Sequence, residues 1–202
     1  MWYSIGTTIA KIYLCLFLLN KFVVSHTENI PVKGPVILAS NHKSNFDPFC
    51  IGAVVKRQVH FMAKDELFRN PFLAWLMRKW GTVQVKRGES DRKAINAAIE
   101  VLKNGQVLGI FVEGTRRKDI KGLGDLKAGA AMLSQRINAP IVPAAIKWGG
   151  RRIHIRFGQP IFVDKLVAEG ETISRKAMHE RINEAITNAL NALLEDSYVT
   201  QG

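Results

Sequence analysis

The stretch VILASNHKSNFD, residues 36–47, joins an apolar run of strand length directly to a cluster of polar residues. A buried strand that ends so abruptly has no packing reason to do so, which indicates a functional loop at its carboxyl end. Histidine changes charge near neutral pH, so His42 is suited to exchange a proton. Asp47 can fold back through a tight turn and accept the other imidazole N–H. The segment is also compatible with a polar turn in which Ser44 or Asn45 caps a helix.

Apolar runs of strand length alternate with amphipathic helical patterns along the rest of the chain. This alternation predicts an α/β domain with a mixed, largely parallel sheet flanked by helices. Functional sites in such sheets form where strands end and helices begin. We expect strands at 36–40, 60–64, 82–85, 107–112, 141–148 and, antiparallel, 153–157, and helices at 71–80, 91–103, 126–137 and 174–195.

A second polar cluster, FVEGTR at residues 111–116, ends the apolar strand at 107–112. Gly114 allows an unusual backbone angle or the close approach of a ligand. Arg116 offers a planar guanidinium fork that suits a phosphate group. The plain alternative is a strand-to-helix turn with a solvated arginine.

Arg87 follows a third short strand, although a surface arginine is the simpler interpretation of that residue alone. If the three strand ends converge, the site combines a candidate base with a carboxylate and two guanidinium groups. The base is His42 with Asp47, and the carboxylate is Glu113. The two guanidinium groups belong to Arg87 and Arg116. That combination suits a phosphorylated alcohol, whose hydroxyl would lose its proton to the base.

Residues 2–24 have helical periodicity, with one polar stripe and one apolar stripe. We expect a helix that lies in one membrane leaflet, because Lys11 interrupts the apolar run and a spanning helix needs about 20 apolar residues. A true span, a core helix and a signal peptide are the alternatives. We therefore expect an interfacial membrane helix and connector at 1–30 and a folded domain at 31–202.

The net charge of +12 indicates an anionic partner, which could be nucleic acid, a membrane or an acidic protein or small molecule. Aromatic residues make up only 8% of the chain and do not interleave with the basic ones, which argues against single-stranded nucleic acid. Cys15 and Cys50 lack the spacing of metal ligands, and a disulfide framework is not expected.

The polar clusters resemble those of the glycerolipid acyltransferases, and most closely the bacterial 1-acyl-sn-glycerol-3-phosphate acyltransferases. The resemblance covers about residues 31–160. The four ordered blocks of that family are matched by Asn41, His42, Ser44 and Asp47; by Gly81 and Arg87; by Phe111, Glu113, Gly114, Thr115 and Arg116; and by Ile141, Val142 and Pro143. The chain departs from the family pattern at Gln84, Val112 and Arg117.

The resemblance implies transfer of a fatty acyl chain from an acyl thioester to the sn-2 hydroxyl of 1-acylglycerol 3-phosphate. His42 would be the general base, oriented by Asp47, and no acyl-enzyme would form. Ser44 would shape the turn around His42, and Lys127 would help to form the phosphate-binding edge.

The resemblance further implies an acyl-CoA or acyl carrier protein donor, a lysophospholipid acceptor and an anionic membrane surface as partners, with no cofactor, metal or nucleic acid. We expect a peripheral or monotopic protein on the cytoplasmic face of the cell membrane. Acylation of glycerol 3-phosphate or of another lysophospholipid is the alternative reaction. A basic membrane- or nucleic-acid-binding module without catalysis is the alternative outside enzymes.

Overall fold

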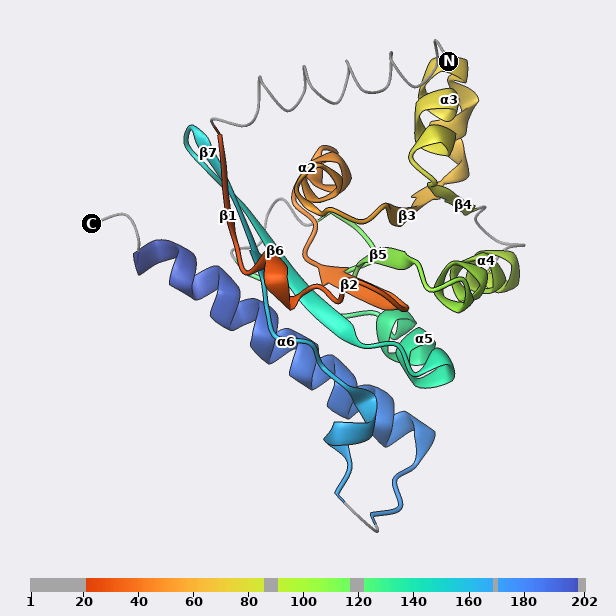
Figure 1. Cartoon of the computed structure of the whole chain (residues 1–202), viewed down its shortest axis with the longest axis vertical. Helices are drawn as coiled ribbons and strands as arrows, with labels where there is room; N and C mark the ends of the chain where they lie inside the picture. The colour runs from red at the N-terminus through yellow and green to blue at the C-terminus, as the bar shows by residue number, and fades with distance from the viewer. Residues whose placement is uncertain (1–20, 86–90, 117–121, 169–170, 200–202) are drawn as a thin grey trace.

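The computed structural model describes residues 21–85, 91–116, 122–168 and 171–199. The strands of this part of the chain form one sheet with the order β1-β7-β6-β2-β5-β3-β4 (Figure 1). Their bounds are Phe22–Ser25 (β1), Val36–Ser40 (β2), Val59–Lys64 (β3), Val83–Val85 (β4), Val107–Phe111 (β5), Ile141–Gly149 (β6) and Arg152–Phe157 (β7).

Neighbouring strands of the sheet are parallel except for β6 and β7, which form an antiparallel hairpin. The central strand β2 pairs with β5 on one side and with β6 on the other. The carboxyl ends of β2, β5 and β6 therefore lie at the same edge of the sheet. The mixed, largely parallel sheet predicted from the sequence is confirmed, including the antiparallel strand near residue 153.

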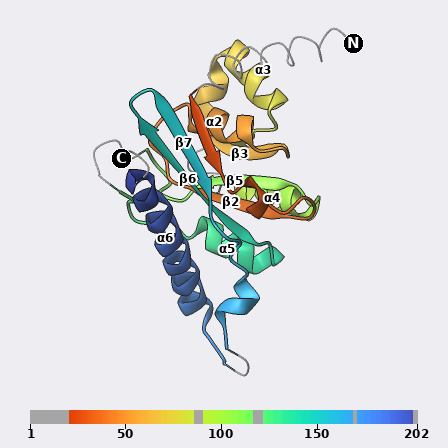
Figure 2. The same ribbon diagram turned by 60° about the vertical axis from the view of Figure 1, so that its left-hand side comes forward.

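Helices cover both faces of the sheet (Figures 1 and 2). One face packs against α4, α5 and α6, whose amphipathic stripes supply a shared apolar core with the sheet. The other face packs against α2 through Cys50 and Ile51. The helices span Asp47–Val54 (α2), Pro71–Lys79 (α3), Asp91–Lys103 (α4), Gly129–Ile137 (α5) and Arg175–Val199 (α6), with short 3-10 turns at Thr27–Asn29 (η1), Asp65–Arg69 (η2) and Val163–Leu166 (η3).

The N-terminal helix predicted over residues 2–24 is wrong at its carboxyl end. Residues from Phe22 to Ser25 form β1, which pairs in parallel with β7, so the sheet begins before residue 31. Val23 and Val24 are β-branched and favour a strand, and the backbone of β7 offers this segment a ladder of hydrogen bonds that outweighs its helical periodicity. Residues 1–20 lie outside the described residues, and the interfacial helix stays a prediction. Among the helices that are described, none is both long and apolar enough to cross a bilayer.

Candidate active site

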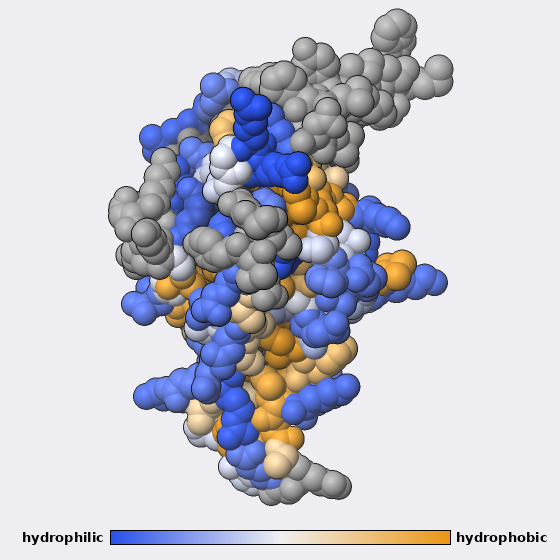
Figure 3. All heavy atoms as spheres, turned by 90° about the vertical axis from the view of Figure 1, so that its left-hand side faces the viewer, coloured by the Kyte–Doolittle hydropathy of each residue, from blue (hydrophilic) through white to orange (hydrophobic). Residues whose placement is uncertain are grey.

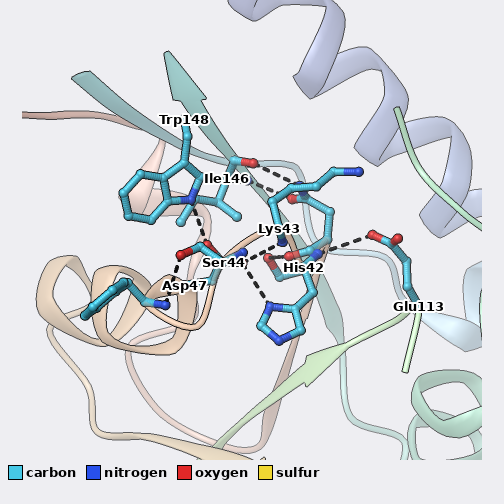
Figure 4. A network of polar contacts seen from close by, with 10 residues as sticks. His42, Lys43, Ser44, Asp47, Glu113, Ile146 and Trp148 are labelled. Atoms are coloured by element: carbon cyan, nitrogen blue, oxygen red, sulfur yellow. Dashed lines mark hydrogen bonds and ion pairs between the residues drawn. The ribbon is translucent and has the colours of Figure 1, made fainter. Parts of the chain in front are cut away.

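His42 and Asp47 form a hydrogen-bonded pair at the carboxyl end of β2 (Figure 4). The Nδ1–H of His42 donates to Oδ2 of Asp47 over 2.9 Å. Asp47 is the first residue of α2 and is fully buried (0% exposed), so its carboxylate lies at the positive end of the helix dipole. The other imidazole nitrogen, Nε2, has no hydrogen-bond partner among the described residues. The pair thus presents one free nitrogen, on a ring whose orientation is fixed.

The turn between β2 and α2 is wrapped around the Asp47 carboxylate. Besides the imidazole, Oδ2 accepts the backbone N–H groups of Lys43 and Ser44, each over 2.7 Å. The hydroxyl Oγ of Ser44 accepts the backbone N–H of Phe46 over 3.2 Å, so it shapes this turn, as the resemblance implied. Phe46, not Ser44 or Asn45, is the residue that precedes the helix. The polar cluster therefore forms the start of α2 and also contains the hydrogen-bonded pair of His42 and Asp47.

Two residues tie this loop to β6. The side-chain amide of Asn41 donates to the carbonyl of Ile146 over 2.9 Å and accepts its N–H over 2.8 Å. Asn41 thereby continues the pairing of β2 with β6 through its side chain, which requires a group that both donates and accepts. Further along β6, the indole Nε1–H of Trp148 donates to Oδ1 of Asp47 over 2.8 Å (Figure 4).

An aromatic stack supports the imidazole from the side of β5. The ring of Phe111 lies 3.9 Å from that of His42 and nearly parallel to it, at 18°. Phe61 stacks behind Phe111 at 5.4 Å. Gly109 makes room for this arrangement, because a Cβ at that position would clash with the Phe61 ring. Three stacked rings, one from each of the neighbouring strands β3 and β5 and one from the residues after β2, therefore cross this part of the sheet. The last ring is the imidazole of His42.

Glu113 joins the end of β5 to the end of β2. Its side chain is buried (1% exposed), and Oε1 accepts the backbone N–H of His42 over 3.2 Å. Oε2 is also buried and has no hydrogen-bond partner among the described residues. Gly114 follows with a positive φ of 68°, and the side chain of Lys127 packs against it. The backbone N–H of Lys127 donates to the carbonyl of Val112 over 2.7 Å, which brings the start of α5 to the same place.

The structure brings most, but not all, of the predicted site residues together. His42, Asp47 and Glu113 are directly connected, whereas Thr115 and Arg116 are exposed just beyond Glu113. Pro143 lies inside the sheet opposite Ala39, not at a strand end. Arg87 lies outside the described residues. Sequence reasoning missed the residues that hold the pair in place, which are Trp148 at the end of β6 and the stacked rings of Phe61 and Phe111.

Cys50 lies on α2 close beneath the pair and is buried. Burial and, to a smaller extent, the nearby negative charge of Asp47 together raise the pKa of the Cys50 thiol to about 12. A thiol with this pKa carries almost no thiolate at neutral pH. Cys50 is therefore poorly suited to act as a nucleophile at neutral pH.

The fold described above agrees with the family to which the chain is matched. The chain belongs to the Acyltransferase family, whose sequence model matches residues 21–147. The 1-acyl-sn-glycerol-3-phosphate acyltransferase of Bacillus subtilis is 35% identical over 124 residues, which are 60% of each protein. The enzyme of that name from Streptococcus pneumoniae is 29% identical over 170 residues, 77% of this chain and 62% of the relative.

The chain spans about 60% of the length of these two bacterial relatives. The crystal structure of the 1-acyl-sn-glycerophosphate acyltransferase of Thermotoga maritima superposes with a TM-score of 0.73 and 24% sequence identity. The match covers 95% of this chain and 78% of that structure. The chain therefore shares its fold with the matched part of that protein.

Proposed function

We propose that this protein transfers a fatty acyl chain from an acyl thioester to the sn-2 hydroxyl of 1-acylglycerol 3-phosphate, which yields phosphatidic acid. The observation that carries the proposal is the hydrogen bond between His42 and Asp47, which leaves Nε2 of the imidazole free. Membership of the Acyltransferase family and the names of the bacterial relatives support the same reaction.

His42 acts as the general base in this reaction. Its Nε2 takes the proton of the acceptor hydroxyl while the oxygen attacks the thioester carbonyl. Asp47 holds the ring in the required tautomer and stabilises the imidazolium that forms. The imidazolium also lies over the face of Phe111, an arrangement that favours a cation. General-base catalysis of this kind contributes about 10²–10⁴-fold to the rate.

The acyl group passes directly to the acceptor without an acyl-enzyme. Cys50 is buried with a raised pKa, and the hydroxyl of Ser44 is engaged with the turn around Asp47. The tetrahedral intermediate therefore forms between donor and acceptor. It collapses by breaking the carbon–sulfur bond, and His42 returns its proton to the departing thiolate.

The end of β5 supplies the groups that bind the acceptor phosphate. Arg116 is exposed three residues after the buried Glu113, and Arg87 and Lys127 complete the basic set in this proposal. Glu113 has a further role that its geometry supports, because its carboxylate accepts the backbone N–H of His42. It thereby holds the loop that carries the base against the loop that carries the phosphate ligands.

The donor is acyl-CoA or acyl carrier protein, and both are anionic. The net charge of +12 favours either donor and also an anionic membrane surface. Part of this charge lies on the β6–β7 hairpin, where residues 147–156 include basic but no acidic side chains. Hydrophilic side chains predominate on the upper part of the face in Figure 3, which includes this hairpin.

We further infer a peripheral or monotopic location on the cytoplasmic face of the cell membrane, through residues 2–20. Leu16→Glu places a charge in the apolar stripe of that segment, and Thr8→Glu places the same charge in its polar stripe. We expect the first substitution to weaken co-sedimentation with anionic vesicles and the second to leave it near the parent level. Equal binding by both variants would contradict the interfacial helix.

A panel of acceptors tests the proposed reaction. Purified protein is assayed with an acyl-CoA donor and with an acyl carrier protein donor against 1-acylglycerol 3-phosphate, glycerol 3-phosphate and several lysophospholipids with other headgroups. We expect the highest kcat/KM with 1-acylglycerol 3-phosphate. A clear preference for another acceptor would assign the sibling reaction instead. A failure of all acceptors with both donors would refute the acyltransferase assignment.

A further inference from the structure

Trp148 reaches the catalytic pair from a distant part of the chain. It lies near the carboxyl end of β6, and its indole Nε1–H donates to Oδ1 of Asp47 over 2.8 Å (Figure 4). The side chain as a whole is 42% exposed, whereas the carboxylate that it contacts is completely buried. One end of the indole therefore faces solvent, and its polar group is directed inward.

The two oxygens of Asp47 are held in very different ways. Oδ2 accepts three N–H groups, all from the loop residues His42, Lys43 and Ser44. Oδ1 accepts the indole N–H of Trp148. Among the described residues, Trp148 is the only one outside residues 42–47 that donates to this carboxylate. A hydrogen bond to a buried, charged acceptor is stronger than one between neutral groups, and its loss leaves the acceptor unsatisfied.

The register of β6 places Trp148 at this point. Asn41 bonds both the N–H and the carbonyl of Ile146, which fixes the height of β6 relative to β2. Trp148 lies two residues further and therefore points to the same face of the sheet as Ile146. Ile146 belongs to the core on the α2 side, so the indole faces the start of α2, where Asp47 lies.

We propose that Trp148 is a positioning residue that fixes the orientation of the Asp47 carboxylate, and through it the imidazole of His42. With Oδ1 bound to the indole, the carboxylate keeps Oδ2 under Nδ1 of His42. Without this donor, the carboxylate can rotate, and Oδ2 no longer meets three donors at once. The proposal rests on the proposed function in that it assigns the base to His42. The bond itself is a property of the fold and can be tested separately.

Two substitutions separate the N–H donor from the ring that carries it. Trp148→Phe keeps an aromatic ring but removes the donor. Trp148→Gln removes the ring but places an amide N–H the same number of bonds from the backbone as the indole N–H. The matched control is Trp75→Phe, the same substitution at a tryptophan of similar exposure, 37%, on α3.

We expect Trp148→Phe to lower kcat by about tenfold with little change in KM, because substrate contacts remain while the base is less well held. Trp148→Gln should recover most of this loss, and Trp75→Phe should stay near the parent. In the absence of substrate, the NMR signal of the His42 Nδ1–H should broaden or disappear in Trp148→Phe and persist in Trp148→Gln. Thermal unfolding of each variant checks that the fold is retained.

An unchanged kcat and an unchanged Nδ1–H signal in Trp148→Phe would overturn the proposal. An equal loss of kcat in Trp148→Phe and Trp148→Gln would also overturn it. The loss would then not depend on the N–H donor at this position. If the parent transfers no acyl group to any acceptor, the proposed function fails. The NMR comparison still decides whether Trp148 positions the pair, because it requires no turnover.

Discussion

Replacement of Asp47 by asparagine removes one charge from the site while keeping the shape of the side chain. The backbone N–H groups of Lys43 and Ser44 cannot turn away from this position, so the amide oxygen must take the place of Oδ2. The amide NH₂ group then takes the place of Oδ1 and faces the indole N–H of Trp148, donor against donor. The turn is preserved, but one hydrogen bond and the negative charge are lost.

The expected cost follows from these contacts. One charge-assisted hydrogen bond is lost, so we expect the free energy of unfolding to fall by roughly 1–3 kcal/mol. The effect on catalysis is larger, because the imidazolium formed in the transition state no longer has an anionic partner. We expect kcat to fall by about 10²–10⁴-fold, which is the range of general-base catalysis.

The assay follows release of free CoA during acyl transfer to 1-acylglycerol 3-phosphate in detergent micelles, for the parent and for Asp47→Asn. Asp164→Asn is the matched control, because it removes the same charge from an exposed aspartate in η3. A variant that retains activity within about tenfold of the parent would refute the assigned role of Asp47. So would an equal loss in Asp164→Asn, because the effect would then not be specific to the site.

Three further predictions follow from the packing and the ionisation of buried groups. Gly109→Ala should lower the unfolding free energy by about 1–3 kcal/mol and also lower kcat, because its Cβ would displace the Phe61 ring; normal stability and activity would contradict the stacked support. In a Cys15→Ser background, iodoacetamide at pH 8 should modify Cys50 only after unfolding, since burial raises the pKa of its thiol to about 12; rapid labelling of the native protein would disagree. Burial and nearby basic groups lower the pKa of His154, so the folded state binds fewer protons than the unfolded state below about pH 6.5. The free energy of unfolding should therefore decline as the pH falls below this value, and urea unfolding at two pH values should show a weaker decline in His154→Gln.

The sheet and its helices could be predicted because their side-chain patterns are regular. The periodicity of α4 and α6 and the apolar runs of β2 and β5 correspond to the elements observed. β1 was missed because its residues continue an apolar helical pattern, and only the pairing with β7 decides their conformation. Such pairing joins residues far apart in the chain, so a local pattern cannot reveal it.

The central pair of the site could also be predicted from local sequence. The spacing of His42 and Asp47 allows the turn that the structure contains, and strand-end reasoning placed Glu113 beside them. The contribution of Trp148 could not be predicted, because it depends on the register that Asn41 imposes on β6. The one signal in the sequence was that Trp148 lies near the end of a predicted strand, as His42 and Glu113 do.

The aromatic support of His42 depended in the same way on contacts across the sheet. Phe61 and Phe111 lie on different strands. In the sequence alone, nothing distinguishes Gly109 from any other glycine within a buried strand. Only the pairing of β3 with β5 sets Phe61 opposite Gly109. The sequence therefore predicted the histidine–aspartate pair, whereas the structure was needed to identify the residues that hold it in place.

The most direct test of the central claim compares the parent with His42→Ala in acyl transfer to 1-acylglycerol 3-phosphate, from acyl-CoA and from acyl carrier protein. If His42 is the general base, the parent forms phosphatidic acid and the variant loses about 10²–10⁴-fold of this activity while it remains folded. An active His42→Ala protein would show that His42 is not the base. A parent that is inactive with both donors would contradict the proposed reaction itself.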